Sequence, residues 1–210
     1  MTPRDGSAAA RFRKAFGAPL VTTDVTLRHN PALFRFGLWS MFNIAAVARQ
    51  AAAIHSSVIS LNGGAVLFLG ESGTGKSTHS RMWLENIEGS TLLNDDAPAV
   101  RISADSTTAY GTPWSGKTPC YRAEHYPLAA LVRIRRAPYN QITRLNTLQA
   151  FGAVLPSCLP TLQQDDRMLD ILCDALSHML SAVPVYTLDC LPNADAARVS
   201  SEALFGDARQ

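Results

Sequence analysis

The pattern of apolar and polar positions divides the chain into helical and extended segments. Apolar residues recur at helical spacing most clearly between 161 and 183, and helices are expected at 31–49, 76–87, 150–155, 161–183 and 194–205. Shorter β-rich runs predict strands at 21–27, 54–61, 65–69, 90–93, 99–103, 107–110, 128–135 and 185–188. This order of elements predicts an α/β fold with a mixed, α+β-like sheet.

Two strand segments carry further information. An Asn-Gly-Gly sequence at 62–64 separates the runs 54–61 and 65–69, which indicates a β-hairpin. In the run 128–135, apolar residues alternate with Arg133 and Arg135, which predicts a strand with one face toward water.

Composition limits the class of protein. Hydrophobic residues make up 47% and charged residues 17% of 210, which excludes a disordered chain. A net charge of +2 is too small for a dedicated nucleic-acid binder, and the longest uncharged stretch, 50–70, is too polar for a membrane span. The four cysteines form no CxxC pair, so we expect free thiols and a cytoplasmic protein. We expect a loosely ordered N-terminus, 1–18, and a single domain, 19–210.

One motif carries specific chemistry. Residues 70–77 read Gly-Glu-Ser-Gly-Thr-Gly-Lys-Ser and match the pattern GxxxxGK[ST], between a predicted strand and a predicted helix. Such a loop turns backbone N–H groups toward phosphate, its lysine reaches the β- and γ-phosphates, and its serine ligates Mg²⁺. The expected nucleotide contacts are Gly70, Ser72, Gly73, Thr74, Gly75, Lys76, Ser77 and Thr78.

An acidic pair, Asp95 and Asp96, follows the next predicted strand at a turn that we expect beside this loop. Two carboxylates near Mg²⁺-ATP can divide the work, since one holds the metal and the other accepts a proton from an attacking hydroxyl. Alone, an Asp-Asp pair before Ala-Pro is typical of a solvated turn. The complete phosphate loop favours the functional interpretation.

Other polar residues have two interpretations. His55 stands alone in an apolar strand, and it either belongs to the core or lines the site. The loop 111–117 is either an ordinary connection or a segment that binds the acceptor or the ATP phosphates. The candidate substrate contacts there and just after it are Trp114, Lys117, Tyr121 and Arg122.

Together, the loop 70–78, the early acid pair and His55 resemble the HPr serine kinase/phosphorylase family, whose nucleotide-binding core is shared with ATP-dependent phosphoenolpyruvate carboxykinase. The specific resemblance covers about residues 50–120. It implies a P-loop core of that type with ATP and Mg²⁺ as cofactors. It also implies that His55 and one acid lie at the acceptor hydroxyl, while Ser77 and the other acid hold Mg²⁺. We expect Asp95 to be the base and Asp96 to be at the metal.

The sequence therefore predicts an ATP- and Mg²⁺-dependent kinase. Its expected acceptor is a hydroxyl group, that of a serine in a protein or peptide. Lys76, Asp95 and His55 are the expected catalytic residues. Two alternatives remain at this point: a non-catalytic ATP-binding switch or partner module, and a small-molecule kinase that accepts free serine, for example. The apolar helix near 33–48 is either buried in the domain or an interface of a homo-oligomer.

Overall fold

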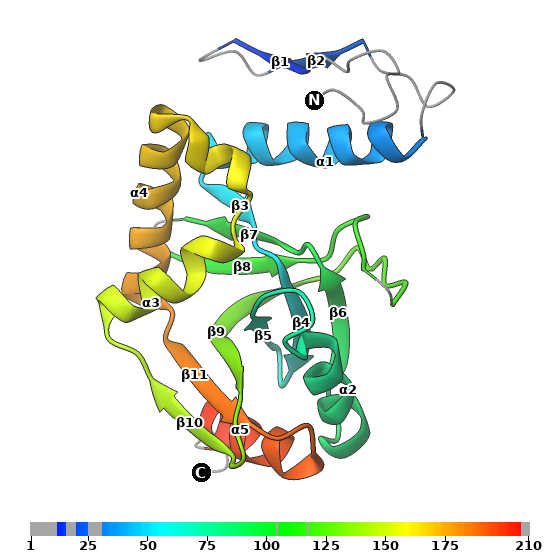
Figure 1. Ribbon diagram of the computed structural model, residues 1–210, viewed down its shortest axis with the longest axis vertical. Helices are drawn as coiled ribbons and strands as arrows, with labels where there is room; N and C mark the ends of the chain where they lie inside the picture. The colour runs from blue at the N-terminus through cyan, green and yellow to red at the C-terminus, as the bar shows by residue number, and fades with distance from the viewer. Residues whose placement is uncertain (1–11, 16–19, 25–30, 104, 117, 207–210) are drawn as a thin grey trace.

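The computed structural model describes residues 12–15, 20–24, 31–103, 105–116 and 118–206. These residues form a mixed α/β fold, with helices on both faces of a mixed parallel and antiparallel sheet, as the order of elements predicted (Figure 1). The helices are α1 Pro31–Val47, α2 Lys76–Asn86, α3 Thr147–Val154, α4 Asp166–Ala182 and α5 Ala194–Phe205. Before α4, where the helix was expected to begin at 161, residues Pro160–Gln164 form a 3₁₀ turn.

Nine of the described strands form one large sheet in the order β3-β7-β8-β9-β5-β4-β6, and β11, paired with β9, adds β10. β9 is parallel to β5 and β11, whereas β4 is antiparallel to both β5 and β6. The strand bounds are β3 Ala51–Ala53, β4 Ser56–Leu61, β5 Gly64–Leu69, β6 Thr91–Asp96, β7 Ala99–Ile102, β8 Thr107–Tyr110, β9 His125–Arg136, β10 Gln141–Arg144 and β11 Val185–Cys190.

The predicted hairpin is present between β4 and β5. Asn62 and Gly63 both have positive φ, 50° and 78°, as a tight two-residue hairpin turn requires. Ser56 then pairs with Leu69 at the far end of the hairpin. The turn thus fixes which residue of β4 lies beside the end of β5.

The strand β9 corrects one expectation. It was expected to turn one face toward water, but Leu131 and Val132, which point to opposite faces, are both fully buried. The cause is its place inside the sheet, between β5 and β11 and beneath helices on both sides. A central strand has no solvent face, so its arginines must lie near its end or against polar groups.

Two apolar clusters hold the layers together. One joins the sheet to α3 and α4 through residues such as Leu67, Leu131 and Leu176. The other joins the opposite face to α2 and α5 through Phe68 and Trp83. The helix α2, which follows the phosphate loop, is therefore anchored by a buried tryptophan and does not lie loosely on the surface.

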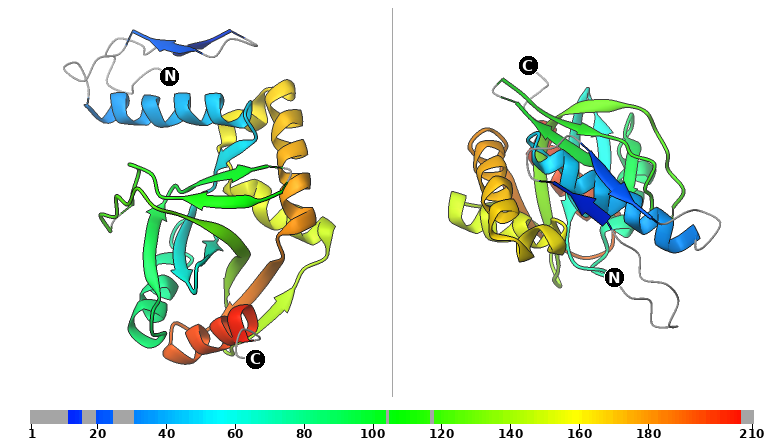
Figure 2. Two further views of the ribbon diagram at one scale, coloured as in Figure 1. Left: turned by 180° about the vertical axis from the view of Figure 1, so that it is seen from behind. Right: turned by 90° about the horizontal axis from the view of Figure 1, so that it is seen from above.

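The N-terminal part of the described chain lies at one end of the molecule. The short strand β1, Phe12–Lys14, pairs with β2, Val21–Thr23, over α1, while α5 lies at the opposite end (Figure 2). Most of the range 1–18, expected to be loosely ordered, lies outside the described residues, as do positions 25–27 of the expected strand. All four cysteines are free thiols. Among the described residues, we find no helix with the length and apolar character needed to span a bilayer.

Candidate active site

The phosphate loop connects the end of β5 to the start of α2. Gly73 and Gly75 adopt positive φ, 80° and 119°, which side chains with a Cβ rarely tolerate. Within the turn, the Thr74 hydroxyl donates to the carbonyl of Glu71 at 2.8 Å. The first N–H groups of α2 lack helical partners and lie at the end of the loop, so the backbone here suits an anion.

Sheet register explains why the acid pair lies beside this loop. Because β5 and β6 are both antiparallel to β4, they run in the same direction and end at the same edge of the sheet. Leu69, the last residue of β5, lies opposite Ser56 of β4, and Ser56 lies opposite Asp96 of β6. The loop that follows Leu69 and the acids at the end of β6 are thereby brought to one place.

The acid pair lies within β6, and not in a turn after it as expected, because the strand continues from Leu93 to Asp96. Successive residues of a strand point to opposite faces. Asp95 points toward α2, where its Oδ1 accepts a hydrogen bond from the Ser77 hydroxyl at 2.9 Å. Asp96 is directed instead to His55, whose Nδ1 lies 3.2 Å from Asp96 Oδ1. Asp95 is only 5% exposed, whereas the Asp96 side chain is 42% exposed.

The Lys76 ammonium lies inside the loop. It donates to the carbonyls of Gly70 at 2.8 Å and Glu71 at 3.2 Å, and its Nζ lies 2.9 Å from Nε2 of His55. Burial lowers the pKa of Lys76, and the negative charges of Asp96 and Asp95 oppose this shift. The lysine is thus a largely desolvated cation held between backbone carbonyls and a histidine.

His55 links the lysine to the second acid. It lies just before β4, and not within a strand as expected, and its backbone N–H donates to the Ser157 carbonyl at 2.7 Å. A charged Lys76 can only donate, so Nε2 of His55 accepts and the ring proton sits on Nδ1, facing Asp96. Asp96, His55 and Lys76 therefore form a continuous polar chain.

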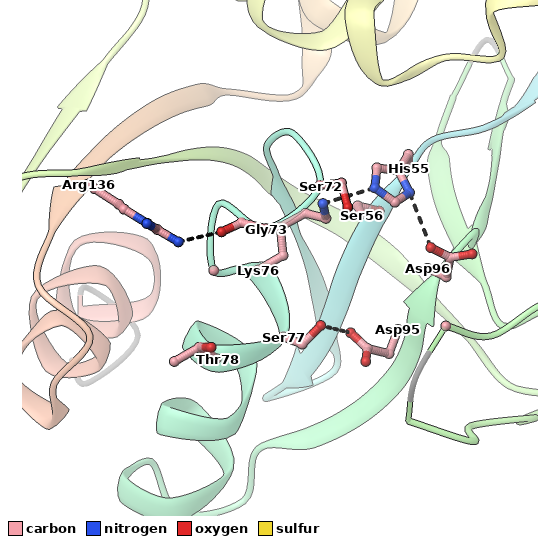
Figure 3. Close-up of a pocket in the computed structure, with 12 residues that line it drawn as sticks. His55, Ser56, Ser72, Gly73, Lys76, Ser77, Thr78, Asp95, Asp96 and Arg136 are labelled. Carbon is pink, nitrogen blue, oxygen red and sulfur yellow. Dashed lines mark hydrogen bonds and ion pairs between the residues drawn. The ribbon is translucent and has the colours of Figure 1, made fainter.

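These groups face one pocket of about 370 Å³, shown in Figure 3. Ser72, Gly73 and Gly75 to Thr78 of the predicted nucleotide-contact set line it, and Gly70 contributes a carbonyl to Lys76. Thr74 lines an adjoining pocket. His55 and Asp96 lie on one side of Lys76, and Arg136 and Thr78 lie on the other (Figure 3). Among the described residues, no group of three or more His, Cys, Asp or Glu side chains forms a metal cage.

Two arginines at this edge were not among the site residues predicted from the sequence. Arg136, the last residue of β9, lines the pocket and donates to the backbone carbonyls of Gly73 and Thr74. Arg133 lies opposite Leu69 in the sheet, with its guanidinium 3.9 Å from the Glu71 carboxylate and donating to the Ala153 carbonyl at 3.0 Å. The parallel pairing of β9 with β5 places both beside the loop, and only knowledge of that pairing could have predicted it.

Gly116 also lines the pocket; it belongs to the loop 111–117, a candidate contact segment, but was not among the residues predicted to make contact. Its N–H donates to the Asp95 carbonyl at 3.0 Å, and a Cβ on it would lie 2.6 Å from the same oxygen. The neighbouring Ser115 forms a bridge with Asp96, so this loop closes against the end of β6. The absence of a side chain at Gly116 is what permits the close approach.

Of the proposed substrate contacts, Trp114, Tyr121 and Arg122 do not line this pocket. Trp114 packs on Phe42 of α1, with ring centroids 5.2 Å apart, and Tyr121 is 61% exposed. Arg122 pairs with Glu124 at 3.6 Å. Lys117 lies outside the described residues. Of this loop, the structure brings Gly116 to the pocket.

Comparison with known proteins gives little beyond this geometry. No family model matches the sequence, and no curated protein matches it. Among solved structures, the chain is similar to that of the Hpr(Ser) kinase/phosphatase from Coxiella burnetii, with a TM-score of 0.42 and 11% sequence identity. The match covers 75% of this chain and 90% of that one. A similarity of this size does not assign the chain to a family.

Proposed function

We propose that this protein is an ATP- and Mg²⁺-dependent phosphotransferase whose acceptor is a hydroxyl group, namely that of a serine in a protein or peptide. One observation carries the proposal. A phosphate-loop lysine, a serine–aspartate pair and a histidine–aspartate pair all line one pocket. Phosphate binding alone needs the loop and the lysine, whereas the second, partly exposed acid adds a group that can accept a proton.

The loop suits a triphosphate. Lys76 presents a cation with little access to water, and the strength of its attraction for phosphate rises as water is excluded. A Cβ built on Gly73 or Gly75 would have no described heavy atom within 4 Å, apart from the immediate chain neighbours. These glycines are therefore needed for the backbone conformation and not for close packing. When bound, Mg²⁺-ATP supplies the phosphoryl group and a divalent cation that neutralises charge on the phosphates.

The Ser77–Asp95 contact supports a metal site at this pair. A hydroxyl and a carboxylate oxygen are hard ligands of the kind that Mg²⁺ prefers, and Mg²⁺ commonly takes only one or two protein ligands beside phosphate and water. Asp95 is buried against α2, where it is held in place. This assignment reverses the expected order, in which Asp96 was at the metal.

Asp96 then takes the role of base. Its carboxylate is partly exposed, so an acceptor can reach it, and His55 holds it from the other side. As the new oxygen–phosphorus bond forms and the bond to the β-phosphate oxygen breaks, Asp96 accepts the proton of the acceptor hydroxyl. Lys76 offsets the charge that develops on the transferred group.

Transfer itself tests the proposal. A cell extract is incubated with the protein, Mg²⁺ and ATP labelled in its γ-phosphoryl group, and labelled products are identified by mass spectrometry. We expect labelled phosphoserine that is absent when Lys76→Met protein is used. Labelling that is equal with the two proteins, or no labelling of any hydroxyl compound, contradicts the proposal.

A further inference from the structure

A second pocket, of about 380 Å³, adjoins the phosphate pocket. The two pockets share Gly75, Thr78 and Arg136 in their walls. The second one lies between the start of α2 and the ends of β9 and β11, so it opens from the phosphate loop in the direction away from the acid pair.

The wall of this second pocket is mainly apolar. Ile134 of β9 and Cys190, Leu191 and Pro192 at the end of β11 contribute to it. His79 of α2 also lines it, with its ring almost fully buried and packed edge-on against Phe68. Apart from Arg136, which it shares with the phosphate pocket, this wall offers mainly apolar contact.

The two pockets lie in an order that matches the parts of a nucleotide. In Figure 3, His55 and Asp96, where the acceptor is proposed to lie, are on the opposite side of Lys76 from Arg136 and Thr78. A phosphate chain whose terminal group lies at Lys76 therefore has its remaining phosphates toward Arg136. Whatever is attached beyond those phosphates enters the apolar pocket.

We propose that this apolar pocket binds the nucleoside of the phosphoryl donor. The inference rests on the proposed function and deepens it, since a phosphate loop alone accepts inorganic polyphosphate as readily as a nucleotide. Burial of a base and ribose against Leu191 and its neighbours adds hydrophobic affinity that inorganic phosphates lack.

The test compares two ligands on the whole protein by isothermal titration calorimetry. The probes are a non-hydrolysable ATP analogue and tripolyphosphate, each with Mg²⁺. The variant is Leu191→Ala, at a side chain that is 38% exposed, and the control is Leu148→Ala, at an 84% exposed position on α3. Thermal melting of each variant confirms that it is folded.

We expect wild-type protein to bind the nucleotide more tightly than tripolyphosphate. Leu191→Ala should raise the Kd of the nucleotide roughly five- to tenfold, from the lost apolar contact, and change that of tripolyphosphate less than about twofold. Leu148→Ala should change neither. Equal affinity of the wild-type protein for both probes, or an equal loss for both in Leu191→Ala, overturns the inference and leaves the proposed function standing. If wild-type protein binds neither probe, both proposals fail.

Discussion

Asp95 and Asp96 are adjacent in sequence, yet their side chains lie in different surroundings. Alternation along β6 sends Asp95 to the serine at the start of α2 and Asp96 to His55. The sequence analysis ended this strand at Leu93 and placed both acids in a turn, where alternation does not apply. With both acids placed in a turn, nothing in the sequence indicated that Asp95 would contact Ser77 and Asp96 would contact His55.

Lys76→Met should remove phosphate binding without unfolding the protein. The substitution loses hydrogen bonds to Gly70, Glu71 and His55, but it also removes a cation whose burial is unfavourable, as its lowered pKa indicates. We expect a thermal midpoint within about 4 °C of wild type, and phosphoryl transfer reduced about a thousandfold or more. Differential scanning calorimetry and label transfer measure the two effects.

A large drop in the melting temperature would show that Lys76 is mainly structural. Transfer near the wild-type rate would contradict its role at the phosphates. Because burial lowers the pKa of Lys76, the ammonium of this lysine should lose its proton at a lower pH in the folded protein than in the unfolded chain. Wild-type nucleotide affinity should therefore fall as the pH rises toward the lysine's ordinary value of 10.5.

Gly116→Ala should displace the acid pair. Its Cβ would lie 2.6 Å from the Asp95 carbonyl oxygen, a backbone atom that cannot rotate away, so the loop or the end of β6 must shift. We expect kcat to fall roughly ten- to a hundredfold, because small displacements of reacting groups are costly. Steady-state kinetics measures the effect.

The matched control is Gly152→Ala, in the middle of α3. No described heavy atom outside the local helix lies within 4 Å of a Cβ built there, and alanine favours helix over glycine. This control should keep wild-type kcat and equal or greater stability. Equal kcat in Gly116→Ala and Gly152→Ala would mean that the close approach at Gly116 does not position the acids.

Among the elements, those with strong periodicity or clear punctuation were predicted well. α5 has its predicted bounds, and the hairpin at 62–64 is present. The start of α4 was misplaced: it was expected at 161, but Asp165 caps the helix by accepting from the Met168 N–H at 3.0 Å. The missed strands β1, β3 and β10 are short and take their extended form from pairing with β2, β7 and β11, so nothing local marks them.

The helix after the phosphate loop is held to α5 by a buried polar group of three residues. Ser200 accepts from Trp83 Nε1 at 2.9 Å, and its hydroxyl lies 3.2 Å from Nε2 of His79. The ring of His79 also packs edge-on against Phe68 of β5, with centroids 4.7 Å apart. The position of α2, and with it that of Ser77, therefore depends on a histidine that is neutral in the folded protein.

This histidine should make stability fall in mild acid. Because burial lowers the pKa of His79 from 6.5 to about 4, the unfolded chain binds a proton first as the pH falls between these values. The free energy of unfolding should drop by about 2 kcal/mol between pH 7.5 and 5.0 from this group alone. Urea denaturation at the two pH values measures the drop in wild type and in His79→Gln.

The variant His79→Gln should lose this part of the pH dependence, whatever its stability at neutral pH. His178→Gln, at an exposed position of α4, is the matched control and should keep the wild-type drop. A drop of the same size in His79→Gln as in wild type would show that His79 does not carry the effect.

At the scale of the whole molecule, the site is a product of strand order. β5 and β6 are separated by α2 in sequence and by β4 in the sheet, and their shared direction brings the phosphate loop and the acids together. The spacing of the motif predicted a loop between β5 and α2, and this loop is present, because such a motif is local in sequence. The contributions of Arg136 and Gly116 arise from non-local pairing, which composition and periodicity do not record.

The same arrangement divides the two acids between two faces of one edge strand. In the proposed function, Asp95 with Ser77 holds the metal, and Asp96 with His55 acts on the acceptor hydroxyl. These roles predict different responses to Mg²⁺. A weakened metal site is filled again when the ion is more concentrated, whereas a missing base is not restored by any concentration of metal.

The most direct measurement is transfer of γ-labelled phosphate to serine by wild type, Asp95→Asn and Asp96→Asn over a series of Mg²⁺ concentrations. We predict that Asp95→Asn needs more Mg²⁺ and regains activity as Mg²⁺ is raised. We predict that Asp96→Asn stays roughly a hundredfold or more below wild type at every concentration. Transfer by Asp96→Asn at the wild-type rate, or rescue of Asp96→Asn and not of Asp95→Asn by Mg²⁺, would contradict the account.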